Sequence, residues 1–283
     1  MTLLNPTARE LFAVARLDFA DVRRSRWMVF CGALYALLGG AFVFVGMRES
    51  SVLGFSGMGR VLMSMIHALI LVLPLLALTA TGQVINRSRD DGTLELLFSH
   101  PVRRGVYFTA VTLTRYAVLT VPLLALLLGM ALLGKVVFRD DVNWAFLAQS
   151  LLISCSLLAA YVGVGIAVST LVRSQARAVI WLLFLWALGA ALLDFGLVAL
   201  LLRFRVNAQT VFLLASLNPV QAARMALLAG ASHELSVLGP VGFYLSNQVG
   251  AAGLFALGVV WPAVVGLGAW LLALRSFRRS DIV

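Results

Sequence analysis

Long uncharged apolar stretches dominate the chain, and polar residues are concentrated in the short segments between them. A helix rises about 1.5 Å per residue, so crossing a hydrocarbon core of about 30 Å takes about 20 residues. Six stretches reach this length. They predict an all-α polytopic membrane protein with six transmembrane helices, over residues 27–47, 61–82, 110–134, 148–171, 178–202 and 251–274. The fourth and sixth lie inside longer uncharged stretches, which blurs their boundaries.

Composition and charge agree with this class of protein. Hydrophobic residues make up 61% of the 283 residues and charged residues only 12%. With the N-terminus placed inside, fourteen of the 22 Lys and Arg residues fall on cytoplasmic segments and seven on outer ones, while Arg115 falls at or just within the start of the third span. Because basic residues are retained on the inner side, both termini are predicted to be cytoplasmic. The net charge of +10 indicates contact with anionic lipid of the bilayer. Nucleic-acid binding is the weaker interpretation, because the arginines are dispersed over four short segments.

Residues 1–26 predict a separate cytoplasmic amphipathic helix that precedes the six-helix permease domain, residues 27–283. Its apolar positions share one face of a 3.6-residue helix and comprise Ala8, Leu11, Phe12, Ala15, Phe19 and Val22. Such a helix is expected to lie flat in the headgroup region. A straight extension of the first span is the alternative.

Residues 86–105 form the polar segment between the second and third spans. Asp91 is placed to cap a helix start, and Pro101 stops the helix from continuing. Between them, Leu94, Leu97 and Phe98 fall on one face, so two or three turns of helix are predicted. That face could lie on the membrane or enter a groove on a soluble protein, and periodicity alone leaves both open.

Three cytoplasmic strings carry a resemblance to a known family. DDGTLELLFSHPVRRG at 90–105 resembles the signature of ABC-2 type exporter permeases, in which a Gly-Thr-Leu-Glu run leads through a short leucine-rich helix to Pro-Val and a basic residue. LDFADVRRSRWMV at 17–29 resembles the start of the family's first span, and STLVRSQARAV at 169–179 resembles its second cytoplasmic turn. One departure is Arg89, which precedes Asp90 where an acid is common before the Gly-Thr pair.

Within the family, the chain looks like the permease that serves maturation of the copper sites of nitrous oxide reductase. The similar features are the GTL-LL-P segment, Asp194 in the fifth span, the helix after Asn218 and the short Phe-Arg-Arg tail at 277–279.

The resemblance implies a bacterial plasma-membrane subunit that pairs with a second copy of itself and with two copies of a cytoplasmic ABC ATPase. ATP and Mg²⁺ would bind to the ATPase, and this chain would hold no cofactor. An extracytoplasmic accessory protein is a further candidate partner. The residues that would couple to the ATPase are Asp91, Gly92, Thr93, Leu94, Glu95, Leu97, Phe98, Pro101 and Arg103.

We expect no catalytic residues and no nucleotide site in this chain. GMALLGK at 129–135 matches the first seven positions of a phosphate loop, but Val136 stands where a Ser or Thr would hold magnesium. The run is also an apolar helix with no strand before it. The chain has three His residues and no His-Glu-x-x-His zinc helix.

Polar groups within the spans are the candidates for a transport path, because burying them in lipid is costly. Asp194 is the main one; a carboxylate hydrogen-bonded within the bundle is the favoured interpretation, and substrate contact or gating is the alternative. Met63 and His67 share a helix face and have the ligand types that suit cuprous ions. Core packing is the stronger explanation for both, and no metal site is predicted.

The chain between the fifth and sixth spans predicts outer helices that are interfacial or re-entrant. Asn218 caps a helix whose first residue is Pro219 and which ends at Gly230. Three classes of function compete: an ATP-driven exporter permease, an ATP-independent secondary transporter, and a non-transporting membrane scaffold. The sequence lacks the inverted repeat that many secondary transporters carry.

Overall fold

The computed structural model describes residues 6–25, 27–53, 58–137, 142–192, 208–231 and 250–279, and over these ranges it contains helices and no strand. The elements are α1 (Pro6–Arg24), α2 (Trp27–Leu53), α3 (Met58–Thr81), α4 (Val84–Asp90), α5 (Thr93–Phe98), α6 (Arg104–Val136), α7 (Trp144–Leu171), α8 (Gln175–Ala187), the π-helix η1 (Leu188–Leu192), α10 (Ala208–Ser216), α11 (Pro219–Ala231) and α13 (Gly250–Arg279). The fold is therefore all-helical, as predicted.

Five helices are long and apolar enough to cross a membrane: α2, α3 with its continuation α4, α6, α7 and α13. They confirm five of the six predicted spans. α6 begins at Arg104, earlier than the predicted start at 110, so the third span extends further than its uncharged stretch. The predicted span at 178–202 corresponds to α8 and η1 as far as Leu192, and its remainder lies outside the described residues. The fifth predicted span, at 178–202, stays a prediction.

The middle of the bundle is built around α7, whose most extensive contacts are with α13 and α3. Gly163 of α7 and Gly266 of α13 meet where these two helices cross. A Cβ atom on Gly163 would overlap the backbone of Gly266, and one on Gly266 would overlap the backbone at Ala159. Small residues let two membrane helices approach backbone to backbone. Glycine is therefore required at this crossing, because there is no space for a side chain.

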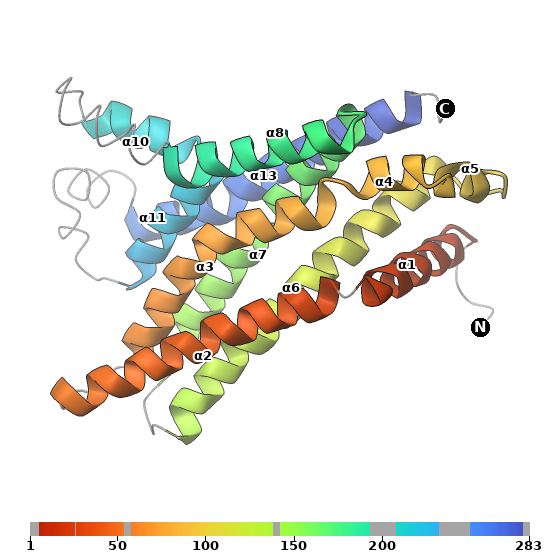
Figure 1. Cartoon of the computed structure of the whole chain (residues 1–283). Coiled ribbons are helices and arrows are strands. Elements are labelled where there is room, and N and C mark those ends of the chain that lie inside the picture. The colour runs from red at the N-terminus through yellow and green to blue at the C-terminus, as the bar shows by residue number, and fades with distance from the viewer. Residues whose placement is uncertain are drawn as a thin grey trace.

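α1, α4, α5 and the C-terminal end of α13 gather at one end of the bundle (Figure 1). A second apolar cluster holds this end together and contains Val14, Ile85, Leu94, Phe108 and Phe277. The first and last described helices thus meet at the same end as the predicted cytoplasmic segment. This geometry supports the expectation that both termini lie on the same side of the membrane, and the side itself stays a prediction.

One side of α1 packs against the protein and another stays exposed. Val14 and Val22 are buried, whereas Phe12 and Phe19 are exposed. The helix is rotated so that a face containing Asp18 meets α6, with which α1 makes its largest contact. The predicted apolar face is thus divided between the protein interior and the surface, and its placement in the headgroup region stays a prediction.

α11 confirms the predicted helix after Asn218, beginning at Pro219 and ending at Ala231, one residue later than expected. The Asn218 Oδ1 atom accepts a hydrogen bond from the amide of Val220, and its Nδ2 donates to the carbonyl of Gly189 in η1. α11 packs against α13 and α7 through buried alanines.

Candidate coupling site

The polar segment between α3 and α6 folds as two short helices separated by a sharp turn. Gly92 has φ +68°, in the left-handed region that favours glycine, and precedes the first residue of α5. The prediction that Asp91 caps the start of this helix is wrong: Asp91 ends α4, and its carboxylate pairs with Arg87 at 3.5 Å. The helix is also shorter than predicted, because it begins only after the turn at Gly92 and ends at Phe98.

The leucine and phenylalanine face of α5 points into the protein. Leu94 is buried, and Leu97 and Phe98 are half-buried against the second apolar cluster. The Phe98 ring lies 5.7 Å from Tyr107 of α6 and 6.2 Å from Phe277 of α13. The sequence left open whether this face would meet membrane or partner, and the resemblance favoured a partner. In the fold these side chains pack against their own chain, and their role in coupling to an ATPase stays a prediction.

The opposite face of α5 is exposed and carries Glu95, Leu96, Ser99 and His100. Leu96 is 71% exposed, although it is an apolar residue at the membrane end where polar segments gather. Leu96 was not among the predicted coupling residues, although its spacing from Leu94 and Leu97 puts it on the other side of the helix. His100 Nδ1 lies 3.3 Å from the carbonyl of Leu96, at the C-terminal end of the helix.

The remaining predicted coupling residues follow the same division. Thr93 is exposed at the start of α5 and Gly92 forms the turn before it. Pro101 and Arg103 are exposed in the connection that leads into α6. The exposed members of the predicted set are therefore Asp91, Thr93, Glu95, Pro101 and Arg103.

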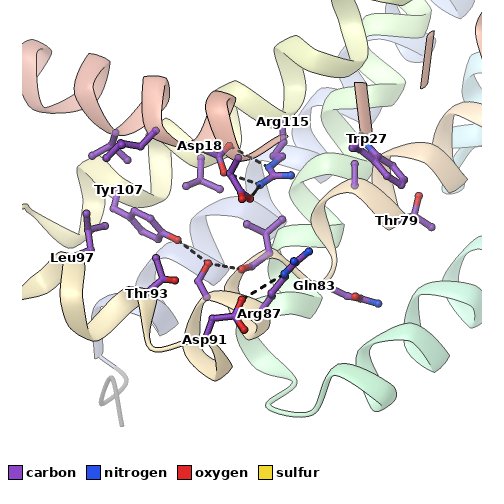
Figure 2. Close-up of a pocket in the computed structure, with 17 residues that line it drawn as sticks. Asp18, Trp27, Thr79, Gln83, Arg87, Asp91, Thr93, Leu97, Tyr107 and Arg115 are labelled. Atoms are coloured by element: carbon purple, nitrogen blue, oxygen red, sulfur yellow. Dashed lines mark hydrogen bonds and ion pairs between the residues drawn. The ribbon is translucent and has the colours of Figure 1, made fainter. Parts of the chain in front are cut away.

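A pocket of about 420 Å³ separates α1 from α4 and α5, and we call it the coupling pocket (Figure 2). It is lined by residues of α1, the end of α3, α4, α5 and α6, including Asp18, Gln83, Arg87, Thr93 and Arg115. The hydroxyl of Tyr107 also reaches it and lies 3.4 Å from the Ser88 hydroxyl on α4. The pocket is also lined by Trp27 of α2, so residues of α1 to α6 surround it.

Two ion pairs flank the coupling pocket, and they differ in burial. Arg115 donates from Nη2 to Asp18 Oδ1 at 2.7 Å and from Nε to Oδ2 at 3.2 Å, which is a bidentate pair. Its side chains are only 11% and 10% exposed, against 67% and 59% for Arg87 and Asp91. Asp21 also approaches Arg115, at 3.8 Å. The buried pair therefore fixes α1 to α6, whereas the exposed pair contributes little.

Burial raises the pKa of Asp18 above its ordinary value, and the charge and hydrogen bonds of Arg115 lower it by less. The ionised carboxylate is thus held in place at a desolvation cost that its partner offsets only in part. Removing either partner would leave an unpaired buried charge, which is the expensive case. A lone Arg next to an apolar run is a signal that Arg115 has a partner, but no pattern in the sequence identifies an acid 97 residues away.

The second cytoplasmic turn contacts α4 from the other side. The Ser169 hydroxyl accepts a hydrogen bond from the amide of Ile85 at 2.9 Å, and Gln175 donates to Asp90 Oδ2 at 2.6 Å. Arg89, the residue that departs from the family pattern, donates to the carbonyl of Thr170. The three strings that carry the family resemblance therefore meet around α4 and the coupling pocket.

The transport-path candidates lie elsewhere. Asp194 is outside the described residues. Met63 and His67 do share a face of α3: His67 Nδ1 lies 2.9 Å from the Met63 carbonyl, and Nε2 is buried without a hydrogen-bond partner in the described part of the chain. Across that same part, no group of three His, Cys, Asp or Glu side chains is arranged to hold a metal. The predicted Met and His pair stays a prediction.

The fold and this site define a class: a multi-pass membrane subunit whose short surface helix packs directly onto its spans. The chain belongs to the ABC-2 family transporter proteins, whose family model matches residues 12–282. It is a permease subunit of an ABC transporter, and the family implies an ABC ATPase as its partner.

Two relatives are similar over nearly the whole length. The chain is 27% identical over 277 residues to the "Probable ABC transporter permease protein NosY" of Stutzerimonas stutzeri, covering 95% of this chain and 98% of the relative. It is also 27% identical over 285 residues to the protein of the same name from Pseudomonas aeruginosa, covering 96% and 99%. The predicted resemblance to the family is therefore confirmed, and the similarity to NosY permeases extends over the whole fold.

Proposed function

We propose that this subunit couples ATP hydrolysis by a separate cytoplasmic ATPase to export, or to transmission of mechanical work, across the bacterial plasma membrane. The observation that carries the proposal is the two-sided character of α5. Its outer face exposes Leu96 beside Glu95, and its inner face is packed onto the spans. A helix of this kind receives a force on one side and passes it on through the other.

The transmission path begins at Phe98. Its ring contacts Tyr107 and Phe277, whose own rings are 6.1 Å apart, and Phe277 lies 5.3 Å from Phe108. Packed aromatic rings resist sliding past one another, because interiors are close-packed. A displacement of α5 would therefore move the cytoplasmic ends of α6 and α13 together. Asp18 and Arg115 would carry the same movement to α1.

The proposed assembly contains two copies of this permease and two ATPase subunits, with ATP and Mg²⁺ bound to the ATPase. An extracytoplasmic accessory protein would meet the opposite end of the bundle. The full-length similarity to two NosY permeases supports the narrower proposal that the output serves copper-site maturation of nitrous oxide reductase. Deletion of the subunit should then leave nitrous oxide reductase produced but deficient in copper, and a fully loaded enzyme would contradict this narrower function alone.

The coupling role is tested by Leu96→Asp in the co-expressed complex of permease and ATPase. Because Leu96 is exposed, the variant should keep the thermal stability of the permease and lose co-purification of the ATPase by about tenfold or more, the loss expected for a buried charge at a contact centre. The matched control is Val137→Asp, an equally exposed apolar position just beyond the other end of α6. Unchanged ATPase binding in Leu96→Asp would contradict the proposed contact.

The same complex separates the competing classes of function. A secondary transporter would keep its activity in an ATPase variant that binds ATP without hydrolysing it, whereas the proposed exporter would lose it. A non-transporting scaffold would show ATP-dependent rearrangement of α1 and α5 with no flux of any substrate.

A further inference from the structure

Two cavities follow one another along the side of α6 that faces α13. The first, of about 630 Å³, lies at the cytoplasmic end and is lined by Arg103, Arg104 and Arg278, with Ala8 and Leu11 of α1. The second, of about 420 Å³, lies between α6, α7 and α13 further along the spans. Thr109 lines both. The two cavities therefore adjoin at Thr109, the first forming a basic mouth and the second an apolar continuation, and we call them together the α6–α13 groove.

The mouth concentrates positive charge. Arg104 Nη1 donates to the carbonyl of Arg278 at 3.2 Å, and the Arg278 guanidinium lies where a side chain at position 105 would stand, so Gly105 admits it. Within the described ranges, neither Arg103 nor Arg278 forms an ion pair, and both are exposed. A cluster of arginines between helix ends on the cytoplasmic side suits a phosphate of an anionic lipid.

The continuation of the groove suits an alkyl chain. Its floor consists of small residues, Ala159, Gly163 and Gly266, at the crossing of α7 and α13. Because glycines have no side chain, the cavity that they line at this crossing stays open. Trp270 Nε1 donates to the Thr112 hydroxyl at 3.0 Å, so these two polar groups at the groove wall satisfy each other.

The dimensions fit one leaflet. From Arg103 to Tyr116 the groove spans thirteen residues of α6, which is roughly 20 Å at helical rise. Half of a hydrocarbon core of about 30 Å is about 15 Å, so a headgroup at the arginines places an acyl chain along the whole apolar continuation. The exposed side chains of Leu113 and Leu267 border it and face the lipid.

We propose that the α6–α13 groove binds one anionic phospholipid of the cytoplasmic leaflet, with its phosphate at Arg104 and Arg278 and one acyl chain against Trp270. Charge complementarity selects this occupant over a second copy of the chain, which would bring no phosphate to the arginines. Because Ala8 and Leu11 line the mouth, the lipid would join α1 to α6 and α13. The inference does not depend on the ATPase.

The test uses the full-length chain in phosphatidylcholine nanodiscs and the fluorescence of Trp270. The Trp270 emission is the difference between the unmodified chain and the Trp270→Phe variant. A trace of phosphatidylglycerol with bromine in the middle of an acyl chain should quench this emission. Brominated phosphatidylcholine should reach the same quenching only at a mole fraction at least about fivefold higher, because each arginine close to an anionic lipid is expected to contribute a factor of this size.

Arg278→Ala should raise the required fraction of phosphatidylglycerol about fivefold, and Arg278→Lys should restore most of the effect. Arg279→Ala is the matched control, because Arg279 is a neighbouring exposed arginine that does not line the groove. Equal quenching by the two lipids, or an unchanged Arg278→Ala, would overturn the proposal. Absence of quenching by either lipid, with disulfide-linked dimers formed by Leu267→Cys, would show that a second copy covers the groove instead.

Discussion

The middle of the bundle and the end predicted to be cytoplasmic are held together in different ways. In the middle, α7 and α13 meet backbone to backbone at Gly163 and Gly266, with no side chain between them. At the cytoplasmic end, the contacts are made by long side chains: the Asp18–Arg115 pair and the rings of Phe98, Tyr107 and Phe277.

This difference indicates where movement is possible. Two backbones in contact cannot shift past each other without a clash, whereas contacts made through long side chains can follow a movement of the helices that carry them. The end that faces the ATPase in the proposed function is therefore the adjustable one. The α7–α13 crossing supplies the fixed reference against which α5 and α1 would move.

The largest effect is expected from Arg115→Ala. It leaves Asp18 buried without its partner, so the free energy of unfolding should fall by about 3–5 kcal/mol and α1 should become accessible to protease. Thermal unfolding in detergent and limited proteolysis measure the two consequences. The double variant Asp18→Leu with Arg115→Met should be close to the unmodified chain. If it is as unstable as Arg115→Ala, the cost arises from lost volume and not from the unpaired charge.

A smaller loss is expected from Gly163→Ala at the α7–α13 crossing. The added Cβ meets the backbone of Gly266, which no rotamer change relieves, and such overpacking costs about 1–3 kcal/mol. Gly268→Ala is the control on the same crossing partner, because nothing lies within 4 Å of its added Cβ. The midpoint of thermal unfolding should fall for the first variant and hold or rise for the second. Equal behaviour would mean that the crossing is looser than described.

Phe98→Leu should separate stability from transmission. It keeps an apolar side chain against the cluster but removes two ring contacts, with an expected loss of about 1 kcal/mol. ATPase binding should persist through the outer face of α5, while stimulation of ATP hydrolysis by the permease should decrease. A variant that loses binding together with stimulation would place the ATPase contact on the inner face.

The smallest effect is expected from Arg87→Ala. Its pair with Asp91 is exposed, so the free energy of unfolding should change by less than about 1 kcal/mol, and the change should shrink further at high salt. Comparison with Arg115→Ala in the same assay isolates burial as the variable, because both arginines line the coupling pocket. A large loss on removing Arg87 would mean that a bound partner buries it.

Sequence alone located five spans, because crossing lipid imposes a length and a lack of charge that are visible in any window of the chain. It also identified the segment at 90–105 and the capped helix after Asn218, since turns and caps depend on neighbouring residues. It misjudged Asp91 as a cap, because Gly92 adopts a left-handed turn that the next helix then follows. For the coupling site, the sequence identified most of the residues involved but not how they are arranged.

Which side of α5 faces outward was decided only by the tertiary structure. The helix has apolar residues on both faces, at Leu94, Leu96, Leu97 and Phe98. Their spacing assigns them to two faces, but it does not show which face packs against Tyr107 and Phe277. The same holds for Asp18 and Arg115, which are unremarkable apart and form the buried link between α1 and α6 together. Local sequence determines what each segment can form, and packing between distant segments determines which surface remains for a partner.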